Sequence, residues 1–373
     1  MSSRETTLIV TTYRFSTEFM QRLRDFLSSP QFSDLAPHSK SEYWQHNAAQ
    51  VEMRISNDTV TIGGNSGFYI PPERFSPRYM AEKALKVARE PSLLVTHIKR
   101  RLGFPRPPIR LLSYFEAFDA VMGHDPVADP DLSEFRLNFL NLRSEPGIMS
   151  SVQEIVDRHS QDDHYEVDQH TVRMYYYLNI LHSKLRLADV GRVVEIGAGS
   201  GNLLALFHRL PGRTTLFNVD LPETMLYAIL YLSDLFPDAR MLLPNEVPTA
   251  VDDLTDYDFV FLTPNQTESI ETDTIDLAIN IDSFQEMTQR QISEYFDLVH
   301  RCARPDSFFF TSNRVEKIPC GPTSFDEVSV EPPNRFSEYP WRPESDVLVH
   351  EICRLTRLVQ LDNAYIHLEQ VRS

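Results

Sequence analysis

The spacing of apolar residues changes near residue 168 of this 373-residue sequence. Before that point, several stretches carry apolar residues at helical spacing, and proline-rich joints separate them. Three examples are residues 77–90, 111–123 and 131–142. We therefore expect residues 1–165 to form a mainly helical N-terminal domain that acts as a lid, an acceptor-binding element, a dimer interface or a combination of these.

One short region of this N-terminal part has a different pattern. Apolar and polar residues alternate in "VEMRISNDTVTI", between Val51 and Ile62, which is the two-residue period of a strand. Asn57 and Asp58 interrupt the alternation, and both are residue types that favour turns. The pattern predicts a small hairpin.

Residues 166–373 alternate between short apolar runs and helical segments. A long helix is expected to start near Asp168, which can act as its N-cap. The apolar runs predict strands at 192–197, 214–220, 239–244, 257–264, 275–281 and 307–313, the helical segments predict helices at 201–210, 222–236 and 288–303, and residues 347–371 predict a helix and one or two strands. Apolar strands that alternate with helices form a parallel sheet covered on both faces, so the expected fold class is α/β.

In such a sheet the ligand binds over the first strand–helix turn, and here that turn is "EIGAGSG" at residues 195–201. A dinucleotide fingerprint requires its third glycine where this chain has Asn202, and no Gly-Lys-Ser/Thr follows for a P-loop. The remaining pattern resembles motif I of the class I methyltransferases that use S-adenosylmethionine (SAM). The resemblance implies a class I, Rossmann-like methyltransferase domain over residues 166–373. The alternative is a tight turn that binds no ligand.

The resemblance implies that the residues of this turn hold SAM and its product S-adenosylhomocysteine (SAH). Gly197, Gly199 and Gly201 let the backbone approach the aminocarboxypropyl arm, and the acid Glu195 suits its ammonium group. Asp220 ends the next strand, 19 residues after Gly201, where a carboxylate can accept hydrogen bonds from ribose hydroxyls. Asp220 could also cap the helix that follows.

The apolar strand at 275–281 ends in Asn280, Asp282 and Glu286, next to the glycine turn in the expected sheet order. Methyl transfer depends mainly on placing the acceptor oxygen in line with the methyl group, and a base that takes the hydroxyl proton adds to the rate. We predict Asp282 and Glu286 as catalytic candidates and Asn280 as a cofactor-binding residue. The structural alternative is that Glu286 caps the next helix and Asn280 satisfies backbone groups.

Several stretches resemble the bacterial sugar O-methyltransferases found with deoxysugar and surface-polysaccharide pathways. They are "SEYW", "VVEIGAGSGNL", "DLPE", "YDFVFLTPNQ", "IDLAINIDSFQEMTQRQISEYF" and "FFFTSNRVEK". The resemblance implies SAM as donor and a sugar hydroxyl, or that of a glycosylated natural product, as acceptor. Three alternatives remain open: O-methylation of a phenolic or polyketide metabolite, an NAD-dependent oxidoreductase, and a non-catalytic module that keeps the fold.

Two neighbouring methyltransferase classes fit the sequence less well. Plant-type and polyketide O-methyltransferases usually carry a catalytic histidine after the strand at 275–281, whereas this chain has "DSFQEM" at residues 282–287. His164 and His170 are the other candidate bases. The Asn/Asp-Pro-Pro-aromatic element typical of DNA and RNA amino-group methyltransferases does not occur at this strand end.

The charge of the chain narrows the range of partners. It has 36 Lys and Arg against 53 Asp and Glu, a formal net charge of -17, which disfavours a nucleic-acid substrate.

No run approaches the roughly 20 apolar residues of a membrane helix, and the N-terminal apolar run is too short for a signal peptide. We expect a cytoplasmic protein with a small-molecule acceptor, no membrane partner and a homodimer as one use of its N-terminal helices. A divalent metal stays open, because some sugar O-methyltransferases use one, but it is not expected, since no third ligand can be named beside Asp282 and Glu286.

Overall fold

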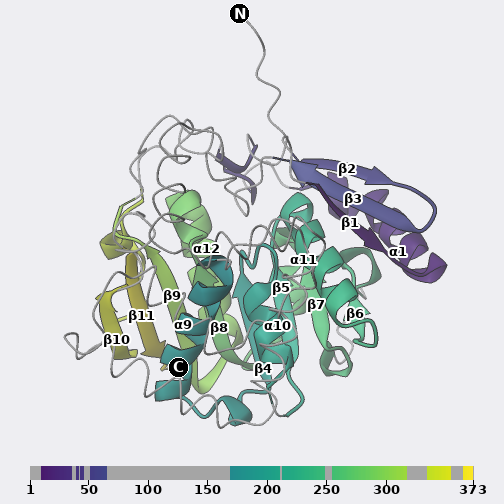
Figure 1. Cartoon of the computed structure of the whole chain (residues 1–373). Coiled ribbons are helices and arrows are strands. Elements are labelled where there is room, and N and C mark those ends of the chain that lie inside the picture. Colours follow the sequence, from purple (N-terminus) through teal and green to yellow (C-terminus); the bar gives the residue numbers. More distant parts are fainter. Residues whose placement is uncertain are drawn as a thin grey trace, which may run out of the picture.

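The apolar runs of the second half pair into one eight-stranded sheet at the centre of the molecule (Figure 1). This computed structural model describes residues 10–35, 39–41, 43–45, 51–64, 169–210, 212–247, 254–316, 334–353 and 364–372. The strands of the sheet are β4 (Arg192–Ile196), β5 (Thr215–Val219), β6 (Met241–Leu242), β7 (Phe259–Leu262), β8 (Ile275–Ile281), β9 (Ala303–Arg314), β10 (Asp346–Ile352) and β11 (Ala364–Gln370). Its helices are α9 (Gln169–Lys184), α10 (Asn202–His208), α11 (Pro222–Leu235) and α12 (Gln289–Cys302).

The strand order is β10-β11-β9-β8-β4-β5-β7-β6. The strands from β9 to β6 are parallel, whereas β11 is antiparallel to β9 and β10 is antiparallel to β11. From β4 the chain moves outward through β5 to the edge strand β6, returns to β7 between them, and then crosses to β8 and β9 on the other side of β4. β4 therefore lies at the point where the strand order reverses, which is where open α/β sheets bind their ligands. This is the strand order of the class I, Rossmann-like methyltransferase fold, so the predicted fold class is confirmed.

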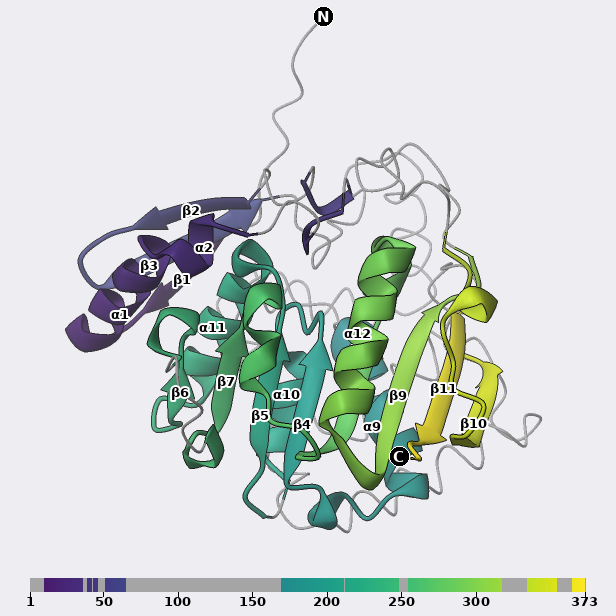
Figure 2. The same cartoon turned by 180° about the vertical axis from the view of Figure 1, so that it is seen from behind.

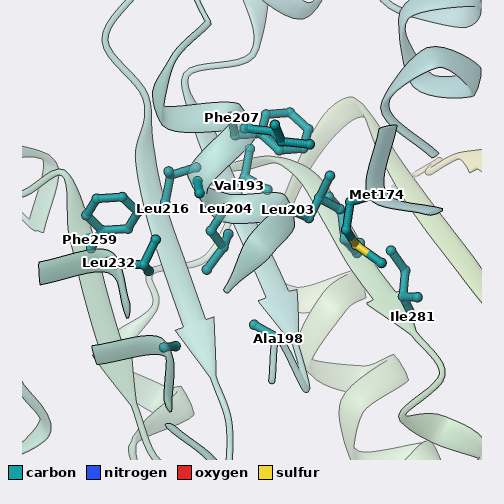
Figure 3. Packing of buried hydrophobic residues seen from close by; sticks show 14 of the residues in the cluster. Met174, Val193, Ala198, Leu203, Leu204, Phe207, Leu216, Leu232, Phe259 and Ile281 are labelled. Carbon is teal, nitrogen blue, oxygen red and sulfur yellow. The ribbon is translucent and has the colours of Figure 1, made fainter. Parts of the chain in front are cut away.

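Helices cover both faces of the sheet, as its apolar strands require. α9 and α10 lie in front of the sheet in Figure 1, and α12 lies on the opposite face, in front in Figure 2. Val193 and Leu216 of the sheet belong to the same buried cluster as Leu203, Leu204 and Phe207 of α10 (Figure 3). A second buried cluster under α12 is rich in phenylalanine and joins that helix to the other face.

An N-terminal unit lies beside α11 and the β6–β7 edge (Figures 1 and 2). It consists of β1 (Val10–Arg14), α1 (Thr17–Leu27), α2 (Pro30–Ser33), β2 (Val51–Ile55) and β3 (Thr59–Gly64). The strands form an antiparallel sheet in the order β1-β3-β2, and apolar residues of α1 join the cluster that contains α10 and α11. Arg22 of α1 fixes the unit to the larger sheet, because Nε and Nη2 each donate to a carboxylate oxygen of Glu246 at 2.6 Å.

The hairpin predicted between Val51 and Ile62 is confirmed by the pairing of β2 with β3. β1 was not predicted, and it makes the described part of residues 1–165 a mixed unit of strands and helices rather than a mainly helical one. The helices predicted at 77–90, 111–123 and 131–142 and the cap at Asp168 lie outside the described residues, so the boundary at 165 stays a prediction. Within the described ranges, no helix combines the length and apolar character needed to cross a membrane.

Candidate functional site

The turn after β4 places three glycines in a backbone conformation that other residues rarely adopt. Gly197, Gly199 and Gly201 have φ values of 72°, 59° and 75°, which lie in the left-handed region where a β-carbon is strained. Gly201 is the N-cap of α10. The predicted strand–turn–helix is therefore confirmed, and the backbone itself explains the spacing of the glycines.

Two of these glycines also allow another segment to approach closely. A β-carbon on Gly201 would lie 3.0 Å from Leu232 Cδ1 and 3.2 Å from Ala228 Cβ, so α10 starts in tight contact with α11. A β-carbon on Gly197 would lie 2.1 Å from Ser283 Oγ. Because Ser283 follows β8, the glycine turn meets the loop after β8 at Gly197.

Asp220, at the end of β5, joins that strand to the glycine turn. Its Oδ2 accepts a hydrogen bond from Gly199 N at 2.9 Å and its Oδ1 accepts one from Leu221 N at 2.7 Å. Leu221 is the N-cap of α11, so Asp220 does not cap this helix. Burial raises the pKa of Asp220 to about 7, against the two N–H groups that lower it, and the nearby Glu286 and Glu223 raise it further. The carboxyl group is therefore held beside the turn, and its pKa lies near neutral pH.

Glu195, on β4, is a second buried carboxyl group within electrostatic reach of Asp220. Its side chain is 3% exposed, and Oε2 has no hydrogen-bond partner among the described atoms. Burial, followed by the charge of Asp220, raises the pKa of Glu195 to about 8. A buried acceptor without a partner is costly and calls for an explanation. A ligand with a cationic group would supply the partner, and the ammonium group of SAM is such a group.

Asn280, near the end of β8, bonds to the end of β4 and to the loop that follows β8. Its side chain is fully buried, and Nδ2 donates to Ile196 O at 2.9 Å. Its Oδ1 accepts from Phe284 N at 3.2 Å and from Asn313 Nδ2 at 2.9 Å. Both polar atoms therefore bond within the protein, as the structural alternative expects, and a role of Asn280 at the cofactor stays a prediction.

Other side-chain amides hold the loop at residues 282–287. Asn313 Oδ1 accepts from Gln285 N at 3.2 Å, and Gln285 Oε1 accepts from Arg314 N at 2.8 Å. From the other side, Asn334 Nδ2 donates to Phe284 O at 3.2 Å. These bonds fix the loop backbone to β9 and to the segment at residue 334, so the loop presents its carboxylates from a defined position.

The two predicted catalytic candidates lie in this loop. Asp282 has a φ of 55° and its N–H donates to Ser312 O at 2.8 Å, while Glu286 is near enough to Asp220 to raise the pKa of that residue. Thr288 caps α12 through its own side chain, so Glu286 does not cap that helix. The structure therefore brings both candidates to the carboxyl edge of the sheet, as the sequence predicted.

A small cavity of about 20 Å³ lies between the glycine turn, the end of β5 and the start of α12. Its described lining includes Gly197, Asp220 and Ser283 from the larger domain and Ser39, Ser41 and Trp44 from the N-terminal part. Sequence reasoning named Gly197 and Asp220 but missed the other four. The only signal for Ser41 and Trp44 was that "SEYW" belongs to the family resemblance.

No group of three His, Cys, Asp or Glu side chains suited to a metal ion occurs within the described ranges. No third ligand of these types therefore joins Asp282 and Glu286 in that part of the chain. The side chains of His164 and His170 lie outside the described residues, so the alternative bases stay predictions.

No protein-family model and no curated protein sequence matches the chain significantly. Solved structures that resemble it include a magnesium protoporphyrin IX methyltransferase from Synechocystis with bound SAH, at 13% identity and a TM-score of 0.39, covering 58% of this chain and 92% of that chain. A SAM-dependent methyltransferase from Methanosarcina mazei matches at 12% identity and a TM-score of 0.36, covering 52% of this chain and 97% of that chain. One from Aquifex aeolicus matches at 12% identity and a TM-score of 0.33, covering 52% and 88%. Such scores carry no argument about activity, so the assignment of fold rests on the strand order.

Proposed function

We propose that this protein is a SAM-dependent O-methyltransferase that transfers a methyl group to a hydroxyl of a small polar acceptor. The observation that carries the proposal is the pair of buried carboxyl groups, Glu195 and Asp220, beside the glycine turn at the switch point of the sheet. One oxygen of Glu195 has no partner among the described residues, and burial raises both pKa values. This arrangement suits a ligand that is cationic and carries hydroxyl groups but no phosphate.

The described residues fit the parts of SAM in a consistent way. The glycine backbone lets the aminocarboxypropyl arm approach the turn closely once the site is open, and Glu195 Oε2, which has no partner among the described atoms, suits the ammonium group. Asp220 keeps acceptor capacity for ribose hydroxyls, because each carboxylate oxygen can accept more than the one hydrogen bond described. When bound, SAM supplies the methyl group and leaves as SAH.

The loop at residues 282–287 supplies the groups that act on the acceptor. Asp282 or Glu286 would accept the proton of the acceptor hydroxyl as its oxygen takes the methyl group that SAM would supply. The amide network around the loop keeps the carboxylates in place, and this positioning supplies most of the rate. The acceptor class, a sugar or glycosylated metabolite, is supported by the family resemblance and by a polar rather than a wholly apolar loop.

Ligand binding separates this proposal from the oxidoreductase alternative. Calorimetric titration with SAH and with NAD should give a measurable dissociation constant for SAH only. Glu195→Gln should weaken SAH binding by roughly tenfold, which corresponds to about 1.4 kcal/mol. Binding of NAD but not SAH would overturn the proposal.

Transfer is tested by offering labelled SAM with a panel of sugars, glycosides and phenols. The proposal expects label in a sugar or glycoside, and this label should resist alkaline hydrolysis, as a methyl ether does and a methyl ester does not. Asp282→Asn should lower turnover by roughly 10²–10⁴-fold and leave the SAH dissociation constant nearly unchanged, since Asn tolerates the left-handed backbone at this position. Full activity in both Asp282→Asn and Glu286→Gln would remove them from the mechanism. Labelled phenols alone would favour the phenolic alternative.

A further inference from the structure

The N-terminal part of the chain contributes one wall of the small cavity beside the glycine turn. The cover segment, residues 39–41 and 43–45, places Ser39, Ser41 and Trp44 on the lining that also contains Gly197 and Asp220. These residues are about 180 positions away from Asp220 in the sequence, and the contact brings the N-terminal unit directly to the proposed chemistry.

Three polar contacts hold the cover segment on the carboxyl edge of the sheet. Lys40 Nζ lies 2.6 Å from Glu223 Oε1 in the first turn of α11. Ser41 Oγ donates to Glu286 O at 2.7 Å, and Ser39 Oγ donates to Asn265 Oδ1 at 3.2 Å. The three acceptors follow β5, β8 and β7, so the cover segment bridges the ends of three strands around the glycine turn.

The cavity beneath the cover segment is too small for a donor of the proposed class. Its volume is about 20 Å³, room for about one water molecule, for which roughly 10–15 Å³ suffices. Small-molecule sites are roughly 300–1,000 Å³ in volume. A ligand of this class that enters this cavity must therefore displace part of its lining, and the cover segment is the part that belongs neither to the large sheet nor to its helices.

Among the three contacts, the ion pair between Lys40 and Glu223 is the one most suited to control the displacement of the cover segment. Both side chains are only partly exposed, at 20% and 24%. The second carboxylate oxygen, Glu223 Oε2, is buried and has no hydrogen-bond partner among the described atoms. The closed arrangement thus leaves one acceptor unsatisfied, which favours opening. The N-terminal unit stays docked through Arg22 and Glu246 while the cover segment moves.

We propose that the cover segment is both a gate and a wall of the SAM site, an inference that rests on the proposed function. The Lys40–Glu223 ion pair keeps the gate closed, its opening admits the donor, and Trp44 then contacts the bound donor. Binding is therefore limited by opening of the cover segment, and weakening the ion pair speeds both entry and release.

Stopped-flow fluorescence with SAH tests this gate, because Trp44 is one of only two tryptophans in the chain. The other, Trp341, contacts His367 in the aromatic cluster under α12, with ring centroids 4.1 Å apart. We expect Lys40→Met and Glu223→Gln each to raise the association and dissociation rates by roughly tenfold. The double variant should show no further increase, because either change removes the same contact. Lys184→Met, an exposed lysine at the end of α9, is the matched control and should leave both rates unchanged.

The outcomes separate the gate from the donor assignment. Trp44→Phe should abolish the fluorescence change while calorimetry still detects SAH. If wild-type protein binds SAH by calorimetry but the rates of Lys40→Met and Glu223→Gln equal those of wild type, the gate is wrong and the donor assignment stands. If wild-type protein binds no SAH, the donor assignment fails. Thermal unfolding identifies any misfolded variant, since the melting temperature of each is expected within a few degrees of wild type. If a single variant is misfolded, the charge-exchanged double variant K40E/E223K replaces it, and this double variant should restore slow entry of SAH.

Discussion

Ser283 lies directly over Gly197, so close that a β-carbon on the glycine would come within 2.1 Å of Ser283 Oγ and 2.4 Å of Ser283 Cβ. The two residues come from different strand ends, β4 and β8, which are neighbours in the sheet. Their contact couples the turn proposed to hold the donor with the loop proposed to act on the acceptor. Glycine is needed here both for its left-handed backbone and for the space that it leaves.

Gly197→Ala should therefore weaken SAH binding by at least tenfold and lower the melting temperature. The added methyl group strains the left-handed backbone by about 1–2 kcal/mol and pushes the loop after β8 away from the turn. Isothermal titration and thermal unfolding measure the two effects.

The double variant Gly197→Ala/Ser283→Gly isolates the steric part. It removes the clash but keeps the backbone strain, so it should recover part of the lost SAH affinity. Gly191→Ala is the matched control, since its β-carbon would meet only Asp276 Oδ2 at an ordinary 3.4 Å. Equal SAH affinity in Gly197→Ala and wild type would show that the turn does not approach the ligand.

Local patterns predicted the parts of the site that depend on one strand and the turn after it. The apolar run before Glu195 and the three glycines specify a strand, a tight turn and a helix, and Asp220 follows from the end of the next strand. These features need only short stretches of chain, so periodicity and residue type are enough to find them.

The contacts between distant segments could not be predicted in this way. Ser41 meets Glu286 across 245 positions, and nothing local to "SEYW" indicates which strand ends it will cover. The internal hydrogen bonds of Asn280 escaped prediction for a related reason. A polar residue at a strand end can face a ligand or bond to neighbouring strands and loops, and only the position of Asn313 shows that the second applies.

Asn280→Ala should act on stability more than on donor binding. It leaves Ile196 O and the loop N–H at Phe284 without their partners, and each unsatisfied buried group costs about 1–3 kcal/mol. A loss of this size lowers the melting temperature of a domain of this length by about 2–4 °C for each kcal/mol. Scanning calorimetry measures it, with exposed Asn57→Ala as the control. A melting temperature equal to wild type together with lost SAH binding would place Asn280 in the donor site.

The stability of the ligand-free protein should fall as pH rises. Glu195 and Asp220 have pKa values of about 8 and about 7 in the folded protein, above their ordinary values in an unfolded chain, so the folded state binds more protons between about pH 4 and pH 8. Their contribution to stability is fully present below about pH 4 and is lost as pH rises to about 8. Melting temperatures measured from pH 5 to pH 9 check this. The same series for Glu195→Gln should show a shallower fall, and the difference between the two series gives the contribution of Glu195. An identical fall in the variant would mean that Glu195 is already ionised near pH 5.

Donor binding should release protons for the same electrostatic reason. A cationic ligand beside Glu195 and hydroxyl groups donating to Asp220 both favour the ionised carboxylates, so binding lowers the two pKa values from about 8 and about 7. At pH 6.5 both groups are largely protonated before binding, and we expect roughly one proton or more to be released per SAH bound. At pH 9, where both groups are already ionised, proton release should approach zero.

The number of protons released is the slope of the binding enthalpy against the ionisation enthalpy of the buffer, measured in several buffers at each pH. Glu195→Gln should reduce the slope at pH 6.5 and leave that at pH 9 unchanged. A slope of zero at pH 6.5 in the wild-type protein would mean that the ligand does not meet these carboxyl groups, because no other group of the described site with a raised pKa titrates in this range.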